Sequence, residues 1–477
     1  MTRLWTGSGM IEAMGGRPFG SVPESISGVS IDSRTLQPGE AFFAIKGDQF
    51  DGHDFATAAL KAGASVLVIA EGKLPALGRI TAPMIVVDDV LAALGRLGAA
   101  ARERSRARVI AVTGSAGKTT TKEMLRHMLA GQGAVHASVQ SFNNHWGVPL
   151  TLARMPEDTD FGIFEIGMNH PGEIRPLVKL VRPHVAMVTM IAAAHLGHFS
   201  SMDEIARAKA EIFEGLDKDG HALINRDDPR ARILAKLAKE AAAAHVTGFG
   251  EQGRIPYLLT SFRASDGGSD VTFRIAGREI AARIGAPGRH IAQNAIAALA
   301  AVHLSGGDVE AAAASLATFQ AEKGRGKRYL LGHEGAQITL IDESYNANPA
   351  SMRAAIEVLS TTPVAEGGRR IAVLGDMLEL GEHARSLHAG LAKALPGSGI
   401  DLLLLGGPEM KALAEAAPKE IAAEHREDLN AIRKLVLETV RPGDAVMVKS
   451  SKSVGFSSIV EALLEAHDKR ADERRSA

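Results

Sequence analysis

The sequence of 477 residues contains no cysteine. Disulfide bonds, thiol catalysis and cysteine-ligated zinc are therefore excluded, and the composition is compatible with a reducing compartment. No apolar run approaches the roughly 20 residues that a membrane-spanning helix requires, and the first residues contain no apolar signal core. We therefore expect a cytoplasmic protein without membrane insertion.

An excess of charge of either sign is also missing. The chain has 54 basic and 55 acidic residues, which gives a formal net charge of −1, and it has no sustained basic stripe. This balance argues against nucleic acid as the main partner. The chain is longer than one hydrophobic core of ordinary size can accommodate, so we expect two or three domains.

One segment combines a buried strand, a glycine-bearing turn and the start of a helix. It spans residues 109–120. Backbone N–H groups in such a turn converge on one spot, and the helix N-terminus adds partial positive charge there. Lys118 would reach the β- and γ-phosphates, and Thr119 would place its hydroxyl on Mg²⁺. The segment therefore predicts a nucleoside triphosphate site made by Thr113, Gly114, Ser115, Ala116, Gly117, Lys118, Thr119 and Thr120.

Alternating strand and helix patterns predict an α/β fold. Near-continuous apolar strands at 109–113, 161–166 and 185–189, joined by helical segments, indicate a parallel sheet that is covered on both faces. Residues 254–284 are typical of β-hairpins, and residues 323–328 are interpreted as a linker. We predict a small N-terminal α/β domain (1–86), a central parallel-sheet ATPase domain with the phosphate loop (87–321) and a C-terminal Rossmann-like α/β domain (322–477).

Acidic and imidazole side chains follow two of the predicted strands. Glu165 lies near the end of one strand, and His195 lies in the loop after the next. Ligands of open parallel sheets bind outside the carboxyl ends of the strands, so Glu165 is predicted to be a metal ligand. Two interpretations of His195 stay open, a ligand of a second metal ion and a structural hydrogen-bonding residue. From the residues alone, Lys209 is interpreted as a solvated lysine on a helix.

Residues 342–349 gather acid, amide and phenol groups in one loop. The helix that follows is predicted to begin near Pro349, because proline suits the first helical turn. A helix cap would need only one of these polar residues, so the cluster indicates a ligand site.

Ten segments together carry a family resemblance. They are residues 32–47, 51–55, 113–119, 143–152, 165–174, 194–196, 208–213, 288–290, 342–349 and 375–380. On these residues nearly the whole chain resembles the Mur ligase family. Within it, segments 143–152 and 344–349 are similar to the members that join D-Ala-D-Ala to UDP-MurNAc-tripeptide.

The resemblance implies a three-domain, ATP-dependent ligase with two Mg²⁺ ions. Thr119 and Glu165 would serve one ion, and His195 would serve the second. Lys209 would be carbamylated by CO₂, and the resulting carboxylate would support the second ion. This role of Lys209 replaces the interpretation as a solvated lysine and rests on the resemblance alone.

Further site residues are carried over from the same resemblance. Asn294 would contact adenine, Asp342 the ribose and Arg328 the phosphates. The expected catalytic residues are Lys118, Lys209, His195 and Arg328. The expected substrate-binding residues are Ser33 and Arg34 on the uridine side, Asn143 and Asn144 at the nucleotide sugar, and Asn346 and Asn348 near the reacting groups.

The implied reaction needs no enzyme nucleophile. Transfer of the ATP γ-phosphoryl group to a carboxylate makes an acyl phosphate, the D-Ala-D-Ala amine attacks it, and phosphate leaves. Residues 324–326 would form a hinge for domain closure, and the resemblance implies a monomer. A folylpolyglutamate synthase-like ligase and a non-catalytic nucleotide switch stay as alternatives. The third peptide residue, meso-diaminopimelate or lysine, also stays open.

Overall fold

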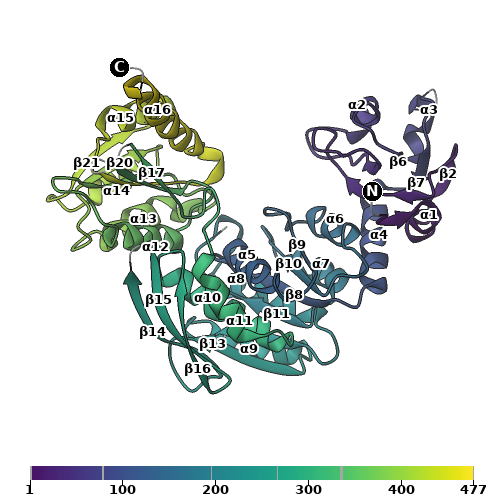
Figure 1. The fold of residues 1–477 in the computed structure, drawn as a ribbon, viewed down its shortest axis with the longest axis horizontal. Helices are drawn as coiled ribbons and strands as arrows, with labels where there is room; N and C mark the ends of the chain where they lie inside the picture. Colours follow the sequence, from purple (N-terminus) through teal and green to yellow (C-terminus); the bar gives the residue numbers. More distant parts are fainter. Residues whose placement is uncertain (1–2, 78–79, 195, 266, 333–336, 476–477) are drawn as a thin grey trace.

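Three large β-sheets, each with its own helices, follow one another along the described part of the chain, and a two-stranded ribbon accompanies the first (Figure 1). The computed structural model describes residues 3–77, 80–194, 196–265, 267–332 and 337–475. We call residues 3–104 the N-terminal unit, 105–322 the central unit and 323–475 the C-terminal unit. In the view of Figure 1 the central unit lies between the other two. The predicted α/β class is confirmed.

The N-terminal unit contains a five-stranded sheet and a separate two-stranded ribbon. The sheet has the order β2 (Arg17–Phe19), β7 (Met84–Val87), β6 (Val66–Ala70), β5 (Glu40–Phe43) and β4 (Gly28–Ser30). The ribbon pairs β1 (Trp5–Thr6) with β3 (Ser25–Ile26). Only the β2–β7 pair of the sheet is antiparallel. Its inner strands are apolar and buried, as expected of a parallel sheet.

The central unit is built on a nine-stranded sheet. Its order is β16 (Arg278–Ile284), β15 (Gly268–Ile275), β14 (Tyr257–Ser265), β13 (His245–Gly250), β12 (His221–Asn225), β11 (Val185–Val188), β8 (Arg108–Thr113), β10 (Phe161–Glu165) and β9 (Val135–Ala137). The strands from β14 to β9 are parallel, and β14, β15 and β16 form the predicted antiparallel hairpins.

Helices cover both faces of this sheet. Along β8, Ile110 and Val112 belong to one buried core with helices α5 and α10, whereas Val109 and Ala111 belong to a second core on the other face with α6, α7 and α8. Because neighbouring residues of a strand point to opposite faces, a strand buried on both sides must be apolar throughout. This confirms the reading of 109–113 as a buried strand.

The C-terminal unit has a six-stranded sheet. Its order is β17 (Lys327–Leu331), β18 (Ile338–Glu343), β22 (Ala445–Lys449), β19 (Arg370–Gly375), β20 (Leu402–Gly406) and β21 (Ala422–Arg426). The antiparallel strand β17 pairs Lys327 with Asp342 and Arg328 with Ile341. The predicted linker 323–328 is therefore too long, because its last two residues belong to β17.

The helices connect and cover these strands. They are α1 (Gly7–Met14), α2 (Ala56–Lys61), α3 (Leu74–Leu77), α4 (Val90–Arg104), α5 (Lys118–Leu129), α6 (Gly147–Ala153), α7 (Ile174–Val181), α8 (Met202–Ala210), α9 (Ala231–Glu240), α10 (Arg289–Leu304), α11 (Val309–Ser315), α12 (Pro349–Ser360), α13 (Ala384–Ala389), α14 (Lys411–Ala416), α15 (Leu429–Thr439) and α16 (Ser457–Arg475). Within the described residues, none of these helices has both the length and the apolar character needed to cross a membrane.

Candidate active site

The phosphate loop joins β8 to α5 as predicted, and two close approaches require its glycines. At Gly114 (φ 154°) an added Cβ atom would lie 1.8 Å from Oγ1 of Thr189. At Gly117 (φ 82°) it would lie 2.5 Å from Oδ1 of Asn294. Any side chain at these positions would collide, so the narrow turn depends on glycine. Lys118 begins α5, and its Nζ donates to the Gly114 carbonyl at 2.8 Å.

Glu165 lies beside the phosphate loop. Strand β10 runs parallel to β8, and Glu165 is opposite Val112 at the carboxyl end of the pair. Its Oε2 accepts a hydrogen bond from Thr119 Oγ1 at 2.8 Å, and its Oε1 accepts one from Asn143 Nδ2 at 2.7 Å. The side chains predicted to hold Mg²⁺ and the amide predicted to face substrate are therefore in direct contact. Carboxylate and hydroxyl oxygens are the donors that Mg²⁺ prefers.

Two lysines are linked electrostatically to this carboxylate: the charge of Glu165 acts on Lys118, and the charge of Lys118 acts on Lys209. Burial lowers the pKa of Lys118, and Arg325 lowers it further while Glu165 opposes the change. Lys209 on α8 is 1% exposed, so its interpretation as a solvated lysine is wrong. Burial holds the pKa of Lys209 well below its usual value, and the charge of Lys118 adds to this effect. Burial disfavours the charged ammonium, and this effect is stronger for Lys209 than for Lys118.

The predicted second metal site is only partly described. His195 lies outside the described residues. Among the described residues, no three His, Asp or Glu side chains come together in a group that could hold a metal ion. The roles of His195 and Lys209 therefore stay predictions.

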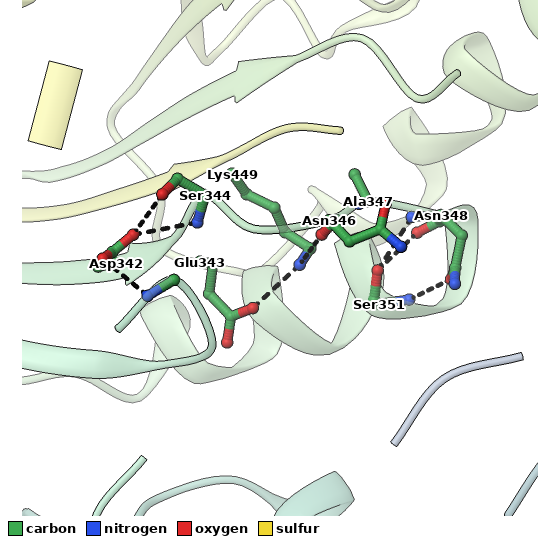
Figure 2. A network of polar contacts seen from close by, with 9 residues as sticks. Asp342, Glu343, Ser344, Asn346, Ala347, Asn348, Ser351 and Lys449 are labelled. Carbon is green, nitrogen blue, oxygen red and sulfur yellow. Dashed lines mark hydrogen bonds and ion pairs between the residues drawn. The ribbon is translucent and has the colours of Figure 1, made fainter. Parts of the chain in front are cut away.

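The loop that follows β18 forms a polar network in the C-terminal unit (Figure 2). Lys449, at the end of β22, donates to Oε2 of Glu343 at 2.9 Å and to the carbonyl of Asn346 at 3.0 Å. Asn348 and Ser351 form a capping box that begins α12. Lys449 is 2% exposed, so this loop is fixed by a buried cation.

Asn348 also reaches the central unit. Its Nδ2 donates to the Ser115 carbonyl of the phosphate loop at 3.2 Å. The helix predicted to begin near Pro349 does begin there. Asn348 therefore serves both as a helix cap and as a contact between the two units.

A cavity of about 620 Å³ lies between the central and C-terminal units. Its lining includes the phosphate-loop residues 115–120, Ser141, Asn143, Glu165, Thr189, Asn294, Arg325, Tyr345, Asn346, Asn348 and Lys449. The structure thus brings residues predicted to bind phosphate and metal together with Asn143, predicted for the nucleotide sugar, and with Asn346 and Asn348, predicted to lie near the reacting groups. Ser141, Thr189 and Lys449 were missed from the sequence, because a single Ser, Thr or Lys outside a motif gives no local signal.

Asp342 and Arg328 do not line this cavity. The fully buried carboxylate of Asp342 accepts hydrogen bonds from Ser344 Oγ at 2.6 Å and from the Gly324 N–H at 2.8 Å. Arg328 donates from Nη2 to Oγ1 of Thr362 at 3.2 Å. In this arrangement Asp342 holds Gly324 of the predicted hinge, and the contacts of Asp342 and Arg328 with ATP stay predictions.

The remaining predicted substrate residues lie apart from the cavity lining. Ser33 and Arg34 follow β4 in the N-terminal unit, where Arg34 is ion-paired with Asp32 at 2.6 Å. Asn144 accepts a hydrogen bond from the Gly147 N–H at 2.9 Å, at the start of α6. Their roles in binding substrate stay predictions.

Comparison with known proteins identifies the same three parts. Residues 25–102 match the Mur ligase family catalytic domain, 112–302 the Mur ligase middle domain, and 327–452 the Mur ligase glutamate ligase domain. The chain is 34% identical over 452 residues to UDP-N-acetylmuramoyl-tripeptide–D-alanyl-D-alanine ligase of Escherichia coli strain K12, with 92% of this chain and 94% of that protein covered.

Two solved structures are similar over almost the whole length. MurF from Acinetobacter baumannii has a TM-score of 0.83 at 30% identity, covering 97% of this chain and 99% of that one. MurF from Thermotoga maritima, solved in complex with ADP, has a TM-score of 0.75 at 26% identity, covering 93% and 98%. The phosphate loop, the three sheets and these similarities agree, and the chain belongs to the Mur ligase family.

Proposed function

We propose that this chain is an ATP-dependent amide ligase that adds D-Ala-D-Ala to UDP-MurNAc-tripeptide. The products are UDP-MurNAc-pentapeptide, ADP and phosphate, so the reaction serves peptidoglycan synthesis. One observation carries the proposal: the phosphate loop and the 343–348 loop line one cavity. The proposal is supported by the 34% sequence identity to a ligase of that name over 452 residues.

ATP would bind with its phosphates on the turn at 114–117. The N-terminus of α5 and Lys118 face that position, and both favour phosphate charge. Thr119 and Glu165 would hold Mg²⁺, since their oxygens are already adjacent. When bound, Mg²⁺ would neutralise charge that develops on the transferred phosphoryl group.

The protein would act by alignment. The carboxylate of the tripeptide attacks the γ-phosphorus of ATP, the bond to the ADP oxygen breaks, and an acyl phosphate forms. The D-Ala-D-Ala amine then attacks the acyl carbon, loses a proton, and phosphate leaves with its electron pair. Lys118 offsets negative charge during the first step, and the cavity holds the two reactants together for the second.

We also propose that Lys209 is carbamylated. Its burial beside Lys118 suits a side chain that ends in a negative charge. The neutral amine would form an N–C bond with CO₂ and release one proton. With ¹³C-labelled CO₂, the intact protein should give one carbamate carbon signal that Lys209→Met removes. A signal that survives the substitution would assign the carbamate elsewhere, and no signal would contradict the modification.

The three domains would divide the work as predicted. The N-terminal domain (1–86) would bind the UDP end through Ser33 and Arg34, the central domain (87–321) would bind ATP, and the C-terminal domain (322–477) would close the site. A monomer in the cytoplasm, where ATP is available, is the proposed working form.

Phosphate release with every component omitted in turn tests this function. The full mixture contains ATP, Mg²⁺, UDP-MurNAc-tripeptide and D-Ala-D-Ala, and product mass is measured in parallel. We expect phosphate release only in the full mixture, together with the mass of UDP-MurNAc-pentapeptide. Release that is indifferent to D-Ala-D-Ala, without a gain in mass, would contradict the proposal, and folate with glutamate would then be tested.

A further inference from the structure

Tyr345 connects the C-terminal unit to the central unit. It lies in the loop after β18, and its phenol oxygen is 2.5 Å from Oγ of Ser141, which lies between β9 and α6. The Asn348–Ser115 hydrogen bond crosses the same boundary. Tyr345 and Ser141 both line the cavity.

The ring of Tyr345 is held in place from its own side of the boundary. The guanidinium of Arg325 lies 4.1 Å and the ammonium of Lys452 lies 5.1 Å from the ring centroid. The Tyr345 N–H donates to the Gly324 carbonyl at 3.0 Å. Cations over an aromatic face attract it, so the phenol has a fixed direction relative to the hinge.

Ser141 lies in a loop that is also fixed. The buried Lys122 donates to the carbonyls of Ser138 at 2.8 Å and Gln140 at 2.5 Å. Gln140 has a φ of 50°, in the left-handed region that non-glycine residues seldom adopt. Surrounding contacts must therefore hold this turn in shape.

The same loop reaches the Mg²⁺ side of the site. Asn143 is two residues beyond Ser141, and its amide holds Glu165 at 2.7 Å. The other carboxylate oxygen of Glu165, Oε2, accepts a hydrogen bond from Oγ1 of Thr119. A continuous path of contacts therefore joins Tyr345 to the carboxylate beside the phosphate loop.

We propose that Tyr345 is a positioning residue that couples docking of the C-terminal unit to the orientation of Glu165. Lys122 fixes the first part of the loop, and the hydrogen bond between Tyr345 and Ser141 fixes its next residue. Asn143 therefore orients this carboxylate better when the C-terminal unit is docked. Phosphoryl transfer is thereby favoured when the acceptor side of the site is in place. This inference rests on the proposed ligase function for its kinetic test.

A double-mutant cycle tests the coupling. Tyr345→Phe and Ser141→Ala each remove one hydroxyl, and Tyr329→Phe, on β17 of the same unit, is the matched control. We expect each single variant to raise the Mg²⁺ concentration for half-maximal phosphate release about three- to tenfold, the range of one hydrogen bond. The double variant should require no more Mg²⁺ than either single variant, and Tyr329→Phe should require the same Mg²⁺ concentration as the unaltered protein.

A distance measurement separates this inference from the ligase proposal. Because the chain has no cysteine, spin labels can be attached through Lys239→Cys on α9 and Lys419→Cys in the C-terminal unit, both exposed. With ADP and Mg²⁺, Tyr345→Phe should broaden the distance distribution toward longer values, and Tyr329→Phe should leave it unchanged. Two results would overturn the inference. One is a double variant in which the two increases in the required Mg²⁺ concentration multiply, and the other is a spin-label distance distribution that Tyr345→Phe leaves unchanged. If the unaltered protein forms no UDP-MurNAc-pentapeptide, the ligase function would be contradicted instead.

Discussion

At the scale of single residues, the site depends on charges that are kept out of water. Glu165 is 1% exposed and is satisfied by Thr119 and Asn143. Burial also lowers the pKa of Lys118. Such groups interact more strongly than they would in water, and they are already placed before the substrate arrives.

Lys118→Met should abolish most of the activity and leave the fold intact. The side chain keeps its length but loses the charge proposed to contact the phosphates, so we expect kcat to fall about 10²- to 10³-fold. Initial rates of phosphate release and thermal unfolding measure the two effects. Lys236→Met is the control, because its ion pair with Glu240 lies on the surface and contributes little. Equal rates for the two variants would contradict the role of Lys118.

Asp51→Asn should reduce stability in a pH-dependent way. Burial alone would raise the pKa of Asp51, but hydrogen bonds from Lys73 and His53 outweigh it and hold the pKa well below its usual value. A carboxyl with a lowered folded pKa contributes full stability above its unfolded pKa of about 3.9 and loses it as the pH falls toward the folded value.

The Tm deficit of Asp51→Asn should therefore be constant above about pH 5 and shrink below about pH 4. Thermal unfolding at several pH values measures it. Asp48→Asn, exposed in the same loop, should leave Tm unchanged throughout. A deficit that grows in acid would mean that the pKa of Asp51 is not lowered in the folded protein.

At the scale of elements, sequence reasoning worked where strands are buried on both faces. Strands β8, β10 and β11 are apolar runs and were predicted within one residue of their observed ends. The short β9 and the edge strand β21 were missed, because they are only partly buried or exposed and have no apolar run. The start of β17 was taken as linker because Lys327 and Arg328 continue the glycine-rich, basic stretch before them and have no apolar pattern, although they pair with β18.

The site residues also divide into those that local sequence patterns predicted and those that they did not. The turn chemistry of the phosphate loop and the position of Glu165 at a strand end were sufficient to predict their proximity, which is confirmed. The environment of Lys209 could not be read from its helix, and only the family resemblance indicated a special role. The contact of Ser141 with Tyr345 joins two units across 204 residues of sequence, and no local pattern predicts such a contact.

Gly324→Ala should reduce stability and activity more than the same substitution at an ordinary turn. Gly324 has a φ of 78°, and an added Cβ atom would lie 2.9 Å from Cβ of Tyr345. Gly253 has a similar φ of 86° but open space around it, so Gly253→Ala measures the backbone strain alone. That strain is about 1–2 kcal/mol. We expect Gly324→Ala to lower Tm further and also to lower kcat, and equal effects would exclude a special role of the hinge contact.

At the scale of the whole molecule, the cavity is lined by residues from two different units. The phosphate loop belongs to the central unit, whereas Tyr345, Asn346 and Lys449 belong to the C-terminal unit. The N-terminal unit lies on the other side of the central unit (Figure 1). A ligase that joins a long nucleotide-linked peptide to a dipeptide needs such a separation of its binding surfaces.

Isotope transfer tests directly whether this molecule forms an amide through an acyl phosphate. We would supply UDP-MurNAc-tripeptide with ¹⁸O in the reacting carboxylate, together with ATP, Mg²⁺ and D-Ala-D-Ala, and measure both products by mass. We expect pentapeptide that has lost one ¹⁸O and released phosphate that has gained it. Unlabelled phosphate, or phosphate formed without pentapeptide, would contradict this mechanism.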